Sequence, residues 1–65
     1  MAKKIINCSY GEVEVRTAVF DINGTDLVEG IEIKGDDIGL IEIYGYYHID
    51  DMSNEEIENL IKDYQ

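Results

Sequence analysis

The chain lacks basic residues over a long stretch, because no lysine or arginine occurs between Gly35 and Ile61. Residues 1–34 hold six acidic and four basic residues, a net −2, although the whole chain carries −10. A folded surface with this charge repels nucleic acid and anionic membranes and attracts basic surfaces. The eight acids of the stretch are Asp36, Asp37, Glu42, Asp50, Asp51, Glu55, Glu56 and Glu58.

Cysteine is almost absent, and Cys8 alone excludes an intrachain disulfide. No Cys/His cluster suggests structural zinc, and a reducing compartment fits best. The chain has no run of about 20 apolar residues, which a membrane span needs. Its apolar start is broken at Asn7, too early for the apolar region of a signal peptide. We therefore expect a cytoplasmic protein with no membrane partner.

The chain is short, and its 65 residues predict one domain over 1–65. A domain of this size buries only roughly 60% of its unfolded surface, which favours a partner or self-association. Disorder is not expected. Hydrophobic residues make up 45% of the chain, and eleven isoleucines fall in short alternating runs.

Alternating apolar residues predict strands. The predicted strands are 3–9, 12–22, 25–34, 38–44 and a short one at 46–49. In 12–22 the alternation slips at Ala18-Val19-Phe20, where a bulge or a strand covered on both faces would explain it. Asn23-Gly24 predicts a type I′ hairpin turn, because both residues tolerate positive φ.

The end of the chain predicts a helix over about 54–64. Ser53 and Glu56 form a capping box, and Met52 can pack on Ile57 as a hydrophobic staple. The apolar stripe at helical spacing is Ile57, Leu60, Ile61 and Tyr64. The predicted fold class is α+β: a small antiparallel meander of four to five strands with one C-terminal helix packed on it. A closed or half-open barrel capped by the helix is the main alternative.

Catalytic and metal-binding patterns are weak. Cys8 and His48 are the one available pair of nucleophile and base, and nothing in the sequence brings them together. The pairs Asp36-Asp37 and Asp50-Asp51 could supply oxygen ligands to a hard cation. The segment 21–26 partly resembles a calcium loop, but its glycine is fourth instead of sixth. Turn formation accounts for these residues, so we predict no enzyme, no metal and no cofactor.

Tyrosines are concentrated at Tyr44, Tyr46 and Tyr47, next to His48. Strand alternation would put Tyr44 and Tyr46 on one face and Tyr47 on the other. Core packing is one explanation, and a binding hot spot is the other, because tyrosine is enriched where interfaces concentrate energy.

Charge and size together favour a small acidic module that covers a basic, nucleic-acid-binding surface of another protein and does not bind nucleic acid itself. In size and charge, and in no motif, the chain is similar to phage-encoded inhibitors of host nucleases, such as anti-CRISPR proteins and DNA mimics. The predicted contact residues are Asp36, Asp37, Glu42, Tyr46, Tyr47, Asp50, Asp51, Glu55, Glu56 and Glu58.

Two other classes of function remain open. The isoleucine-rich sheet could form a homo-oligomer in a structural or assembly protein, with the acids serving solubility. A metal-dependent or catalytic domain would rest on the aspartate pairs and His48 alone.

Overall fold

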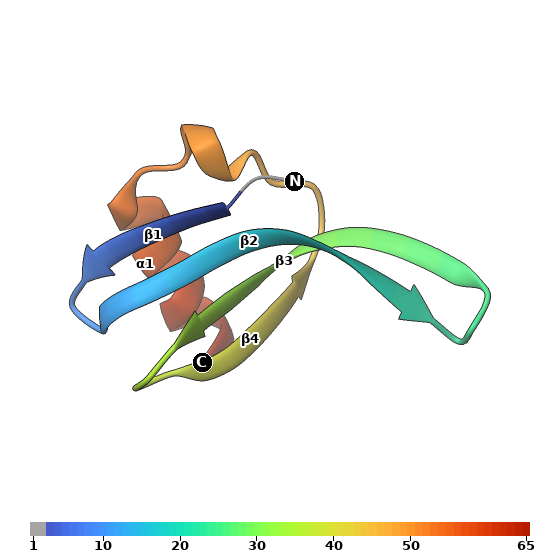
Figure 1. Cartoon of the computed structure of the whole chain (residues 1–65), viewed down its shortest axis with the longest axis horizontal. Helices are drawn as coiled ribbons and strands as arrows, with labels where there is room; N and C mark the ends of the chain where they lie inside the picture. The colour runs from blue at the N-terminus through green and yellow to red at the C-terminus, as the bar shows by residue number, and fades with distance from the viewer. Residues whose placement is uncertain (1–2) are drawn as a thin grey trace.

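The alternating segments form one antiparallel sheet in the computed structural model, which describes residues 3–65. Its strands follow one another as a meander in the order β1-β2-β3-β4 (Figure 1). The strands are β1 (Lys3–Cys8), β2 (Gly11–Ile22), β3 (Asp26–Gly35) and β4 (Gly39–Tyr44). A short 3-10 turn, η1 (Ile49–Asp51), and one helix, α1 (Asn54–Tyr64), follow the sheet. The α+β meander is thereby confirmed.

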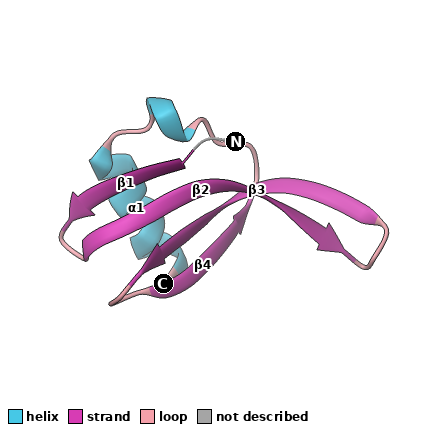
Figure 2. Ribbon diagram, viewed as in Figure 1, coloured by secondary structure: helices cyan, strands magenta, loops and turns pink. Residues whose placement is uncertain are grey.

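The helix packs on one face of the sheet and leaves the other face uncovered (Figure 2). Ile57 and Ile61 of α1 are fully buried, and they meet the inward-facing residues of the strands. The core contains eight isoleucines and two valines: Ile6, Val13, Val15, Ile31, Ile33, Ile41, Ile43, Ile49, Ile57 and Ile61. No polar or charged side chain is buried among the residues described.

The capping box at the start of α1 is confirmed. The Ser53 hydroxyl accepts from the Glu56 backbone N–H at 3.1 Å, and the Glu56 carboxylate accepts from the Ser53 N–H at 3.2 Å. Met52, the predicted staple residue, packs against the core that contains Ile57. The helix therefore begins where its local sequence specifies.

Three expectations from the sequence are wrong. The sheet is open, because β1 and β4 are its edges, so the barrel alternative fails. The predicted strand at 46–49 is absent. Gly45 has φ 137°, which ends β4, and the chain turns into η1. The register of β2 with β3 is continuous through Ala18 to Phe20, so no bulge occurs there.

The change in apolar alternation at Ala18-Val19-Phe20 instead coincides with the start of a hairpin that projects from the sheet. The pairing of β1 with β2 reaches Arg16, and that of β4 with β3 reaches Gly30. Beyond those points β2 and β3 pair with each other as a ribbon that extends away from the helix, and Glu29 at its base also accepts a hydrogen bond from the Gly45 N–H (Figure 1). We call Val19–Glu29 the arm and the rest of the fold the body.

The arm ends in the predicted turn. Asn23 and Gly24 both have positive φ, 60° and 76°, as a type I′ turn requires. Pairing resumes at Asp26 instead of Thr25, so the loop has three residues. Neither face of the arm lies beneath the helix. Val19 and Leu27 are therefore exposed, by 57% and 75%.

Candidate functional site

The predicted acidic residues do not form one surface. The β3–β4 turn, which carries Asp36 and Asp37, lies at the end of the sheet where β4 begins. The η1 turn, which carries Asp50 and Asp51, follows the other end of β4. Figure 1 shows η1 at the top of the view and the β3–β4 turn at the bottom. A strand of six residues spans about 20 Å, so the two groups lie at opposite ends of the sheet.

A first acidic group includes residues from the N-terminal half. The β1–β2 and β3–β4 turns lie at the same end of the meander, because Val13 pairs with Gly35 and Glu14 with Lys34. Both turns line a hollow of about 380 Å³ that holds four carboxylates and the Lys34 ammonium. We call these acids, Glu12, Glu14, Asp36 and Asp37, the turn cluster. Sequence proximity alone could not pair Glu12 and Glu14 with the two aspartates.

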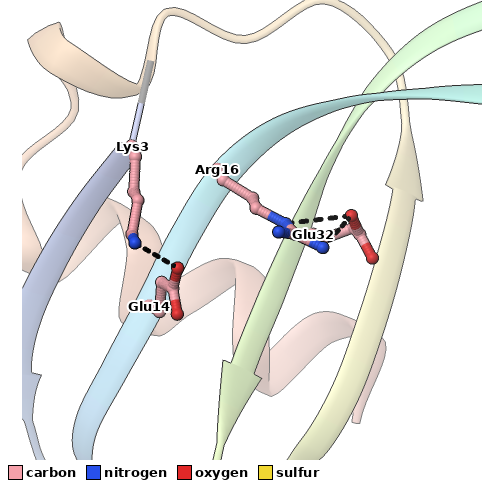
Figure 3. A network of polar contacts seen from close by, with 4 residues as sticks. All are labelled: Lys3, Glu14, Arg16 and Glu32. Carbon is pink, nitrogen blue, oxygen red and sulfur yellow. Dashed lines mark hydrogen bonds and ion pairs between the residues drawn. The ribbon is translucent and has the colours of Figure 1, made fainter. Parts of the chain in front are cut away.

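The uncovered face of the sheet carries balanced charge. Lys3 contacts Glu14 at 3.2 Å, and Arg16 contacts Glu32 at 3.1 Å, across neighbouring strands (Figure 3). Glu42 lies opposite Glu32 in the register of β3 with β4 and is exposed. Because bases interleave with acids here, Glu42 does not belong to a purely acidic surface.

Glu58 is also not free to meet a partner. Its Oε1 accepts from the Ser9 backbone N–H at 2.9 Å, and its Oε2 lies 3.7 Å from Lys62 Nζ. The Ser9 N–H, with further help from the Ser9 hydroxyl and Lys62, holds the pKa of Glu58 below its usual value, although partial burial opposes the shift. This residue ties α1 to the β1–β2 turn and serves the fold.

The second acidic group forms where η1 meets α1. Asp50, Asp51, Glu55 and Glu56 are all exposed, and we call them the loop–helix cluster. Glu55 and Glu56 occupy the first turn of α1, where the positive end of the helix dipole favours negative charge.

Lys4 holds the loop that presents this cluster. Its Nζ donates to the Met52 carbonyl at 2.5 Å and to the Ile49 carbonyl at 3.5 Å. The side chain of Ile49 is buried in the core, which fixes η1 from the other side. A cation from β1 thus anchors the backbone beneath Asp50 and Asp51 without pairing with either carboxylate.

A groove runs between the segment after β4 and the exposed side of α1. It has a volume of about 510 Å³, and Tyr46, Tyr47 and Leu60 contribute its apolar surface together with Met52. Asp51 and Glu56 also line it, with His48 and Asn59, and no lysine or arginine does so within residues 3–65. We call it the tyrosine–acid groove. It brings together four of the ten predicted contact residues: Tyr46, Tyr47, Asp51 and Glu56.

The two tyrosines of the groove differ in role. Tyr47 is half-buried, packs against the core and covers Gly45. Tyr46 is 72% exposed and makes an edge-on ring contact with His48, with centroids 4.9 Å apart. Tyr44 does not share its surroundings, because it packs edge-on against Phe20 on the uncovered face at 5.0 Å. The expected pairing of Tyr44 with Tyr46 depended on the strand that Gly45 ends.

A second hollow, of about 520 Å³, lies on the other side of the same segment, between η1 and the base of the arm. Val19 and Tyr46 are its exposed apolar residues, and Glu29, Asp50 and Asp51 are its charged ones. Among the described residues, no lysine or arginine lines this hollow either, although His48 does. Glu29 and Val19 could not be assigned to this site from the sequence, because 21 residues or more separate them from Asp50 along the chain.

The residues considered for catalysis and metal binding are not assembled. Cys8 ends β1 beside the β1–β2 turn, whereas His48 follows the opposite end of the sheet. Within residues 3–65, no group of three or more His, Cys, Asp or Glu side chains is arranged to hold a metal ion. Asp21 and Asp26 lie on either side of the arm turn, so the hairpin accounts for the resemblance of this segment to a calcium loop.

Comparison with known proteins gives no further guide, since no protein-family model, no curated protein and no solved structure matches the chain. In the described part of the chain, neither α1 nor η1 has the length and apolar character needed to cross a membrane.

Proposed function

We propose that this protein is a small acidic binding module that inhibits another protein by covering its basic, nucleic-acid-binding surface. The observation that carries the proposal is the tyrosine–acid groove with the loop–helix cluster around it. There, the carboxylates of Asp51 and Glu56 line an apolar groove, and none of the described residues that line it is a lysine or an arginine. The turn cluster and the uncovered sheet face lack this combination, since each includes a lysine or an arginine.

Charge alone would not hold such a partner. An exposed ion pair contributes only about 0.2–1 kcal/mol, so four of them fall well short of the roughly 8 kcal/mol that a micromolar complex needs. Carboxylates instead speed encounter with a basic surface, with on-rates up to roughly 10⁸–10⁹ M⁻¹s⁻¹ at low salt. The remaining free energy has to come from buried contact area, which Tyr46 and the groove offer.

The proposed compartment is the cytoplasm. Cys8 is a free thiol, and its Sγ faces the Gly11 carbonyl at 3.7 Å. A lone thiol in a domain without disulfides suits a reducing environment, in which nucleic-acid-handling proteins are abundant.

The proposal is tested by capturing partners from a native lysate, with stepwise salt elution, followed by competition with nucleic acid. Two variants are compared, each of which removes three exposed carboxylates. The site variant is Asp50→Asn, Asp51→Asn, Glu55→Gln, and the control variant is Glu12→Gln, Asp36→Asn, Asp37→Asn.

We expect a basic partner that nucleic acid displaces, and we expect the site variant to lose it at lower salt than the control variant. Equal weakening by both variants would show that net charge, not this site, holds the partner. A partner that nucleic acid does not displace would contradict the inhibitory role.

A second function, self-association, is favoured by the arm alone. Leu27 and Val19 are diagonal neighbours on one face of the ribbon, and both are more than half exposed. Sedimentation over a range of concentrations tests it. A dimer that Leu27→Asn abolishes without unfolding would support a homo-oligomer, and a monomer at all concentrations would exclude it.

A further inference from the structure

The tyrosine–acid groove has the features of a site for one particular side chain. We propose that it receives an arginine from the partner, with the guanidinium against the Tyr46 ring and the carboxylates of Asp51 and Glu56. This inference rests on the proposed function, because it names the group by which a basic partner is held.

The shape and chemistry of the groove fit a long side chain with a charged end. Met52 and Leu60 are partly buried on the core, and with Tyr47 they offer an apolar surface for the methylene groups of an arginine. Tyr46 stands 72% exposed at the groove, so much of its ring is accessible. Asp51 and Glu56 supply negative charge at the same opening.

Arginine suits this arrangement better than lysine. Its planar guanidinium can stack on an aromatic ring and also donate hydrogen bonds to a carboxylate within the same plane. A lysine ammonium is a compact and strongly hydrated charge, which gains less from an aromatic surface. A cation–π contact at an exposed site contributes about 0.5–1 kcal/mol, so a lysine that stays hydrated and forgoes this contact binds roughly two- to fivefold more weakly.

The occupant comes from another protein, because this chain has no arginine to spare. Arg16 is its one arginine, and both its Nε and Nη2 lie 3.1 Å from Glu32 Oε1. Lys3, Lys4 and Lys62 are also engaged, with Glu14, the loop carbonyls and Glu58. A second copy would also bring its own charge of −10 toward this acidic surface.

The test uses two blocked peptides of equal length, one with arginine and one with lysine alternating with glycine. Their affinities for the whole protein are measured by calorimetry at low and physiological salt. The contact surface is mapped by amide chemical shifts. The site variants are Tyr46→Leu, Tyr46→Phe, Asp51→Asn and Glu56→Gln, and the control variants are Tyr64→Leu and Asp37→Asn.

These variants separate binding from folding. Glutamine at position 56 keeps a side-chain oxygen that can accept from the Ser53 N–H, so the capping box is retained. Phenylalanine at position 46 keeps the ring face and removes only the hydroxyl. Tyr64 is 54% exposed and lies at the far end of α1, which makes it a matched exposed tyrosine outside the groove.

We expect the arginine peptide to bind roughly two- to fivefold tighter than the lysine peptide, with that preference lost in Tyr46→Leu and kept in Tyr46→Phe. Asp51→Asn and Glu56→Gln should weaken both peptides, and the control variants should weaken neither. If both peptides bind equally and Tyr46→Leu affects neither, the arginine site is overturned, but the proposed binding of a basic partner is not. Binding of neither peptide at low salt would overturn both proposals. If the amide shifts of the groove residues change with protein concentration in the absence of peptide, the groove binds a second copy of this chain, which would overturn the arginine site.

Discussion

The body and the arm are built from the same two long strands, yet they differ in nearly every measure of packing. Among residues 3–65, all ten buried apolar side chains lie in the body, and no residue from Val19 to Glu29 is buried. The helix covers one face of the body and does not reach the arm (Figure 2). The radius of gyration, 11.7 Å, exceeds the roughly 10.7 Å of a compact chain of this length, consistent with the projection of the arm.

The difference shows that alternating sequence makes a strand but does not decide what the strand packs against. Val15 and Val19 occupy the same face of β2, and their exposed fractions are 0% and 57%. Two strands without a covering layer cannot bury a face, and isolated hairpins are marginally stable. The body therefore provides the stability, and the arm depends on its junction with the body.

The largest effect should come from the core of the body. Ile31→Ala should lower the free energy of unfolding by about 2–5 kcal/mol, because the side chain is fully buried in the core and its removal leaves a cavity. Urea unfolding measures the loss. Leu27→Ala in the arm is the matched control and should change stability by less than about 0.5 kcal/mol. If both variants lose a similar free energy of unfolding, the body and the arm do not differ in their contribution to stability.

The junction should be the next most sensitive point. A Cβ at Gly30 would overlap the Ile43 carbonyl oxygen and lie 2.7 Å from Phe20 Cε2. Gly30→Ala should therefore force β3 and β4 apart and cost about 1–3 kcal/mol. Gly30→Ala should change the amide chemical shifts of Ile43 and Tyr44. Gly24→Ala, at the turn of the arm, should change the amide chemical shifts of the turn residues only. A Gly30→Ala protein as stable as the wild type would show that the junction is not tightly packed.

The attachment of the arm should depend on an aromatic pair. Phe20 of the arm and Tyr44 of the body meet edge-on, with ring centroids 5.0 Å apart. We expect a coupling of about 0.5–1.5 kcal/mol in a double-mutant cycle of Phe20→Leu and Tyr44→Leu. Hydrogen exchange should show faster opening of arm amides in Phe20→Leu, with body amides little changed. Additive effects of the two substitutions would mean that the rings do not hold the arm.

The smallest effect should be a pH dependence confined to the body. The pKa of Glu58 is lowered in the folded protein, mainly by the Ser9 N–H, so its ionised form stabilises the fold. That contribution is present above the ordinary glutamate pKa of about 4.3 and is lost as pH falls through the lowered folded value. The stability difference between wild type and Glu58→Gln should therefore shrink below that pH. The control is the stability difference between wild type and Glu55→Gln over the same pH range. If that difference depends on pH in the same way as the difference for Glu58→Gln, this role for Glu58 is contradicted.

Much of the fold could be predicted from the sequence because its signals are local. The strand alternation, the Asn23-Gly24 turn and the capping box of Ser53 and Glu56 each depend on residues a few positions apart. These signals placed the four strands and the helix within a residue of their observed ends. The pairing of Glu58 with Lys62 one helical turn later was predictable for the same reason.

What the tertiary structure decided is which of the acids and tyrosines meet. The sequence by itself determined the net charge, the basic-free stretch and the residue types available for binding. Only the register of the meander joined Glu12 and Glu14 to the β3–β4 turn. Only the end of β4 at Gly45 turned Tyr46 away from Tyr44 and toward α1. Such contacts depend on chain reversals and on the packing of distant segments, and the spacing of residues along a chain does not encode their distance in space.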